Sequence, residues 1–68
     1  MSKRITLRAM RADAGFTQGE IAKLLGVQRK TIVIWEKSPE KMKPYQVLAF
    51  ARACGFDIDD VSMPAENT

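Results

Sequence analysis

The stretch GVQRKTIVIWEK, residues 26–37, decides the fold of this chain of 68 residues. Its centre, Thr31-Ile32-Val33-Ile34, is a run of β-branched side chains, which favour strands because branching at Cβ restricts χ1. A strand here would have no partner, since no second β-rich segment with a hairpin turn lies nearby. We therefore predict a helix over about 28–37, held by packing against its own propensity.

Helical spacing divides this stretch into two faces. At about 100° per residue, Ile32 and Trp35 point to one side, which we expect to be buried. The opposite side carries Lys30, Val33, Ile34 and Lys37. This second stripe mixes cations with exposed aliphatic side chains, so it is the part of the segment that calls for a functional explanation.

The segments before this helix carry clear helix signals. Thr17-Gln18-Gly19-Glu20 has the T-x-x-E form of a capping box and predicts a short helix that ends at Gly26. Upstream, Thr6 is a candidate N-cap of a first helix that runs to Ala14 and stops at Gly15. The apolar residues at helical spacing in these two helices are Leu7, Met10, Ala14, Ile21, Leu24 and Leu25.

The segments after it continue the pattern. Pro44 suits the first position of a fourth helix that ends near Gly55. Its apolar repeat consists of Val47, Leu48, Ala51 and Cys54. A last turn or two is expected near Asp57–Ser62, carrying Phe56, Ile58 and Val61 inward. We predict an all-α domain over residues 1–63, a compact bundle of four helices plus a short fifth, followed by a frayed tail over 64–68.

The composition limits the chemistry that this domain can perform. The chain has one cysteine, Cys54, and no histidine, so it has no internal disulfide and no Cys/His metal site. We expect Cys54 in the core, and no metal or cofactor. Catalysis is not expected either, because the sequence offers no His, no paired carboxylates on one helix face and no glycine-rich phosphate loop. No apolar run reaches the length of a bilayer span, so a soluble cytoplasmic protein is expected.

Charge is unevenly distributed along the chain. All 11 Lys and Arg residues lie within 1–52, whereas four of the 8 acidic residues lie within 53–68. A basic body of this kind suits a polyanionic partner, although many small proteins are basic without one. The predicted short helix, glycine turn and basic second helix are the parts of a helix-turn-helix, whose second helix enters the DNA major groove.

At this point the sequence resembles the Cro/C1-type (XRE-like) helix-turn-helix family of phage repressors and bacterial regulators. The resemblance covers residues 6–61. It rests on Leu7, Arg11, Gly15-Phe16-Thr17-Gln18, Ile21-Ala22, Leu25-Gly26-Val27, Thr31-Ile32 and Trp35-Glu36, and further on Pro44, Leu48, Ala51, Gly55-Phe56 and Ile58-Asp59-Asp60-Val61. It implies a lambda-repressor-like fold and a DNA-binding transcriptional regulator, most similar to a Cro-like repressor.

The resemblance also implies roles for individual residues. Arg11 and Glu36 occupy positions that form an ion pair orienting the recognition helix. Gln18 occupies the position of a glutamine that bonds a DNA phosphate and braces that helix. The expected phosphate contacts are Thr17, Gln18, Lys37, Lys41 and Lys43, the last two from a loop that runs along the DNA backbone.

The expected base contacts are Gln28, Arg29, Lys30, Val33 and Ile34. Family members usually carry a small polar residue at position 28 and polar residues at 33 and 34, so the aliphatic pair departs from the family pattern. Aliphatic side chains can still read the thymine C5 methyl group. Two alternatives remain open for Val33 and Ile34, a patch that docks a partner protein, as in an antitoxin or accessory regulator, and incidental exposure.

One such module buries too little DNA surface for tight specific binding, which predicts a homodimer on a palindromic operator. The acidic C-terminal turn is the expected dimer edge, kept away from DNA by its own charge. The apolar residues expected there are Phe56, Ile58, Val61 and Met63. We expect double-stranded DNA as the partner, with no small-molecule ligand.

Overall fold

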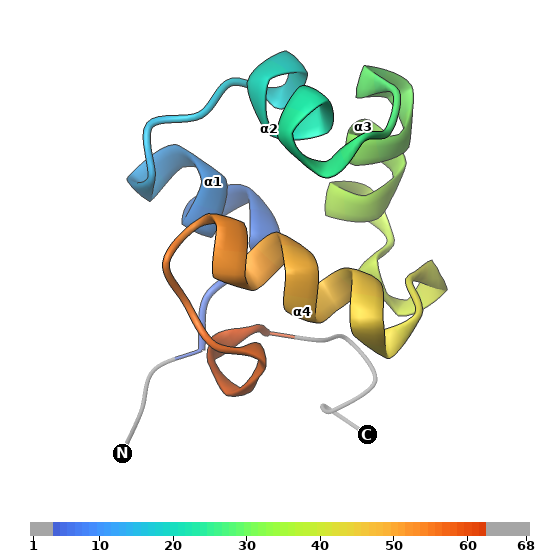
Figure 1. Ribbon diagram of the computed structural model, residues 1–68. Helices are drawn as coiled ribbons and strands as arrows, with labels where there is room; N and C mark the ends of the chain where they lie inside the picture. Colours follow the sequence, from blue (N-terminus) through green and yellow to red (C-terminus); the bar gives the residue numbers. More distant parts are fainter. Residues whose placement is uncertain (1–3, 63–68) are drawn as a thin grey trace.

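The computed structural model describes residues 4–62, and the predicted all-α class is confirmed. The helices are α1 (Leu7–Asp13), α2 (Gln18–Leu25), α3 (Arg29–Lys37) and α4 (Pro44–Ala53), with 3₁₀ turns η1 (Pro39–Lys41) and η2 (Ile58–Asp60). In Figure 1, α2 and α3 lie together at the top of the molecule, α4 crosses its middle and η2 lies at its foot. The domain therefore presents α2 and α3 at the end opposite η2.

The helix starts follow the local signals in the sequence. The Thr6 hydroxyl accepts a hydrogen bond from the Ala9 amide at 3.1 Å, so α1 is capped as predicted. In α2 the Thr17 hydroxyl accepts from the Glu20 amide at 3.1 Å, while the Glu20 carboxylate accepts from the Thr17 amide at 2.8 Å. Gly26 then ends α2 with a left-handed φ of 72°, which favours glycine and turns the chain sharply into α3.

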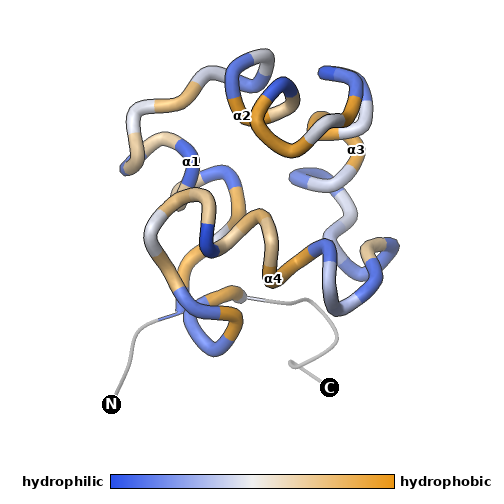
Figure 2. Tube along the Cα trace, in the orientation of Figure 1, coloured by the Kyte–Doolittle hydropathy of each residue, from blue (hydrophilic) through white to orange (hydrophobic). Residues whose placement is uncertain are grey.

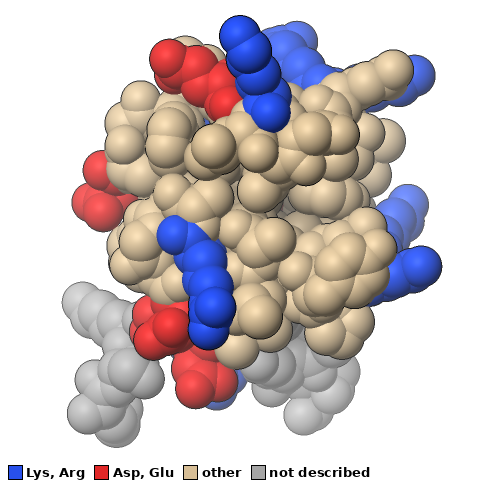
Figure 3. Space-filling view, viewed as in Figure 1, with Lys and Arg blue, Asp and Glu red and all other residues tan. Residues whose placement is uncertain are grey.

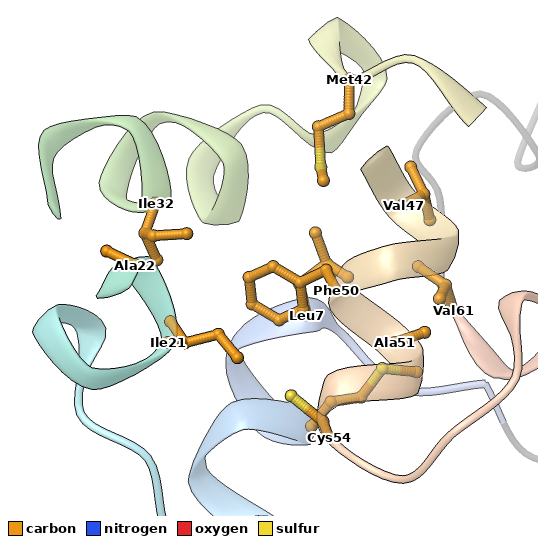
Figure 4. Close-up of a cluster of buried hydrophobic side chains, with 11 residues drawn as sticks. Leu7, Ile21, Ala22, Ile32, Met42, Val47, Phe50, Ala51, Cys54 and Val61 are labelled. Atoms are coloured by element: carbon orange, nitrogen blue, oxygen red, sulfur yellow. The ribbon is translucent and has the colours of Figure 1, made fainter. Parts of the chain in front are cut away.

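The β-branched stretch is helical, as predicted. Ile32 is 0% exposed, and Figure 4 shows its side chain beside Ala22 of α2. The small Ala22 side chain permits the close approach of these two helices. Trp35, predicted to be buried, is only half-buried and packs against the rim of the core.

The hydrophobic core draws side chains from all four helices and from the loops. Figure 4 shows Phe50 of α4 near its centre, with Ile21 and Leu7 close by. The core consists of Leu7, Met10, Ile21, Ala22, Ile32, Met42, Val47, Phe50, Ala51, Cys54 and Val61. Burial raises the pKa of the Cys54 thiol, which keeps it protonated and weakly reactive.

Four side chains differ from the helical pattern predicted for them. Leu24 is 59% exposed and Ala14 is exposed, so neither contributes to the core as the helical spacing predicted. In α4, Leu48 is half-buried and Phe50 takes the central position that the sequence pattern did not assign to it. Small angular shifts on short helices decide which of two adjacent apolar residues is buried.

The two ends of the described chain are joined by a backbone contact that was not predicted. Ile5 and Val61 form an isolated parallel β-bridge. The Ile5 amide donates to the Asp60 carbonyl and the Ser62 amide donates to the Ile5 carbonyl, each at 2.8 Å. The bridge holds η2 against the body and leaves Val61 only 1% exposed.

Within residues 4–62, no helix is long and apolar enough to cross a membrane. In the same range, no three acidic, Cys or His side chains gather as metal ligands.

Candidate nucleic-acid interface

The outward face of α3 combines exposed cations with an exposed aliphatic side chain. Arg29, Lys30 and Lys37 are exposed, and Ile34 is 49% exposed. Figure 2 shows this helix hydrophilic in its first turn and hydrophobic in its middle. Val33, predicted on the same outward stripe, is half-buried. The exposed face of α3 is therefore narrower than its helical spacing predicted, because Val33 is only partly accessible.

The first turn of α3 lacks a side-chain N-cap. Its N-cap residue, Gln28, is exposed and makes no side-chain capping hydrogen bond, and its first turn has no acidic residue. The base contact predicted for Gln28 stays a prediction.

An ion pair ties α3 to α1. Arg11 Nε lies 2.5 Å from Glu36 Oε2, and Arg11 Nη2 donates to Glu36 Oε1 at 3.3 Å. Arg11 Nη1 also donates to the Phe16 carbonyl at 2.8 Å, which links the pair to the turn before α2. The Arg11–Glu36 pair inferred from the family resemblance is therefore present and links α3 to α1, while its orienting role stays a prediction.

Gln18 extends this ion pair into a network that spans three helices. Its Nε2 donates to Glu36 Oε1 at 3.1 Å, and its Oε1 accepts from Arg29 Nη2 at 3.2 Å. Gln18 therefore bonds two side chains of α3, while its bracing role and its phosphate contact stay predictions. The bond to Arg29 was missed, because no local sequence signal reveals which side chains meet between two helices.

The network borders an open concavity of about 840 Å³ between α1, the start of α2 and α3. Its walls carry four cationic side chains, Arg8, Arg11, Arg29 and Lys37, and one anionic one, Glu36, which is paired with Arg11. Thr17, Gln18 and Val33 also line it. The predicted phosphate contacts Thr17, Gln18 and Lys37 thus share one surface with two cations of α1 that were not assigned to DNA.

Lys41 and Lys43 lie elsewhere, between α3 and α4. Lys41 ends η1 and Lys43 precedes α4, and both are exposed. In Figure 3, basic side chains appear at the top, along the right edge and over the middle of this face, whereas acidic ones appear at the left and gather at the foot over η2. The right edge of this face is therefore basic, and its foot is acidic.

The predicted dimer edge is only partly available. Val61 is 1% exposed, which agrees with its predicted inward position but not with a place at a dimer edge, because the bridge to Ile5 draws it into the core of its own domain. Phe56 is half-buried against the core, whereas Ile58, predicted to point inward, is 39% exposed. Met63 lies outside the described residues.

The geometry of α2, the Gly26 turn and α3 is that of a helix-turn-helix. Over residues 4–62 the chain matches the model of a family described as a helix-turn-helix domain, and it belongs to that family. It is 43% identical over 60 residues to an uncharacterized HTH-type transcriptional regulator of Archaeoglobus fulgidus, across 85% of this chain and 83% of the relative. No solved structure is significantly similar to the chain.

Proposed function

We propose that the protein is a sequence-specific DNA-binding transcriptional regulator that places α3 in the major groove. The exposed cations of α3 carry this proposal. Arg29, Lys30 and Lys37 face outward, while the single carboxylate of the helix, Glu36, is held by Arg11 and Gln18. A helix with this distribution attracts phosphates on both sides of a groove and presents donors to base edges. Membership of the helix-turn-helix family and the regulator from Archaeoglobus fulgidus support it.

In this proposal the residues divide into two groups. Gln28, Arg29 and Lys30 donate to purine edges, and Ile34, with Val33 beside it, contacts thymine methyl groups. Thr17, Gln18, Lys37, Lys41 and Lys43 contact phosphates and set the register of the domain on the duplex. Gln18 is already bonded to Arg29, so it also limits which conformers Arg29 uses to reach a base.

The finer identity proposed is a Cro-like repressor of the Cro/C1 type, which acts in the cytoplasm as a homodimer on a palindromic operator. A single module of this size buries only about 600–1,000 Å² on DNA, which limits its affinity. Two modules on half-sites about 34 Å apart overcome that limit. Ile58, 39% exposed beside half-buried Phe56, is the apolar side chain offered for the dimer contact.

Selection of bound duplexes from a random pool tests sequence-specific binding. We expect a palindromic consensus whose half-sites contain thymine. Replacing the contacted thymine by uracil removes one methyl group and should weaken wild-type binding by about 1 kcal/mol. The same replacement should leave Ile34→Ala unaffected, because that variant has already lost the contact. A pool that yields no enriched sequence would refute sequence-specific recognition.

A second candidate function is docking of a partner protein by α3, favoured by the 49% exposure of Ile34. A salt titration separates the two. Phosphate neutralisation makes log K fall linearly with log salt, whereas apolar docking gives no such fall.

A further inference from the structure

Arg8 is a cation that no predicted role explains. It lies in the first turn of α1, outside the helix-turn-helix, and its side chain is exposed. Within residues 4–62, no hydrogen bond or ion pair holds its guanidinium group. Nevertheless it lines the same concavity as Arg29 and Lys37 of α3.

This position is electrostatically unfavourable within the domain itself. The amino end of a helix carries a partial positive charge, and α1 has no acidic residue in its first turn to compensate it. The electrostatics of α1 therefore do not favour a cation at residue 8, which directs attention to a partner.

The surroundings of Arg8 define the chemistry of that partner. Glu36 neutralises Arg11, so the remaining positive charge of the concavity comes from Arg8, Arg29 and Lys37. Arg29 is bonded to Gln18, which is neutral and leaves that charge uncompensated. A guanidinium group bonds phosphate oxygens through two parallel N–H groups. Cations on opposite walls of one concavity suit a chain of phosphates that passes between them.

We propose that the DNA-contacting surface extends onto α1, and that Arg8 binds a backbone phosphate of the strand bordering the groove that α3 enters. This inference rests on the proposed DNA-binding function. Arg8 would then carry no base preference but would add affinity and help to fix the orientation of the domain.

The test compares Arg8→Gln with Arg52→Gln, which removes the same charge from an exposed position on α4 that does not line the concavity. Binding to a fixed duplex of about two helical turns is measured as log K against log salt. Arg8→Gln should lower the slope by about one unit and weaken binding several-fold at low salt. Arg52→Gln should leave the slope unchanged, and Arg8→Lys should retain it because the charge is kept. Thermal melts establish that each variant is folded.

The outcomes separate this inference from the proposed function. If the wild type binds with a salt-dependent affinity and Arg8→Gln keeps the same slope, Arg8 is not in the interface, although DNA binding stands. If Arg52→Gln lowers the slope equally, the effect is one of net charge and the inference is again wrong. If the wild type binds no duplex at low salt, both proposals fail.

Discussion

The two helices of the helix-turn-helix begin in opposite ways. The first turn of α2 is closed by its own side chains, because Thr17 and Glu20 cap each other's backbone amides. The first turn of α3 has no such closure, since Gln28 makes no side-chain capping bond. Local sequence signals therefore define α2, whereas contacts with the rest of the domain hold α3. The difference leaves the start of α3 available to another molecule.

The strongest test of this comparison removes the main anchor of α3. Ile32 is 0% exposed, and Ile32→Ala should lower the free energy of unfolding by about 2–5 kcal/mol, as for other buried isoleucines. Small domains have only about 5–15 kcal/mol in total. Urea titration followed by circular dichroism measures the loss.

Ile34→Ala is the matched control, because it makes the same truncation in the same helix at a side chain that is 49% exposed. Its effect should stay within about 0.5 kcal/mol. Equal losses for both variants would mean that α3 is not held by its inner face.

Glu36 is the second residue that holds α3 on the domain, through hydrogen bonds instead of apolar packing. Its carboxylate accepts from Arg11 and from Gln18, so Glu36→Gln should cost about 1.5–3 kcal/mol, the range of hydrogen bonds to charged groups. The exposed Glu40→Gln should change stability by less than about 0.5 kcal/mol. A double-mutant cycle with Arg11→Gln should show coupling, and additive effects would contradict the network.

The same division explains what the sequence alone could predict. The caps at Thr6 and Thr17 and the Gly26 turn depend on neighbours within a few residues, so their positions follow from local chemistry. The half-burial of Val33 and the bridge between Ile5 and Val61 depend on distant partners. Val61 is buried because Ile5, far away in sequence, bridges to it.

In the candidate site too, local features could be predicted from local sequence signals, and contacts between helices could not. The sequence predicted the exposed cations of α3, and the family resemblance supplied the Arg11–Glu36 pair. The bond from Arg29 to Gln18 and the position of Arg8 on the concavity arise only when three helices are assembled.

A side-chain N-cap for α3, like the one that Thr17 provides for α2, should stabilise the first turn of α3. Gln28 has an extended backbone, with φ −81° and ψ 152°, which suits a capping residue. Gln28→Ser should therefore raise stability by about 0.5–1 kcal/mol, whereas Thr17→Ala should lower it by about 1 kcal/mol. Thermal melts of both variants measure this. Destabilisation by Gln28→Ser would show that the Gln28 side chain already stabilises the start of α3.

The smallest expected effect concerns Gly19, in the first turn of α2. Its φ is not positive, and a Cβ added there would meet only the Thr17 hydroxyl oxygen, at 4.0 Å. Gly19→Ala should therefore raise stability by about 0.4–1 kcal/mol, chiefly by restricting the unfolded chain. Gly26→Ala should instead destabilise the domain, because Gly26 has a φ of +72°. Melting temperatures of the two variants should shift in opposite directions.

Gly19 also lines the concavity, so the salt titration of DNA binding described for Arg8 can be applied to Gly19→Ala. A more stable Gly19→Ala variant that binds DNA more weakly would mean that a phosphate approaches the backbone of α2 closely, whereas unchanged binding would place the DNA farther from this turn.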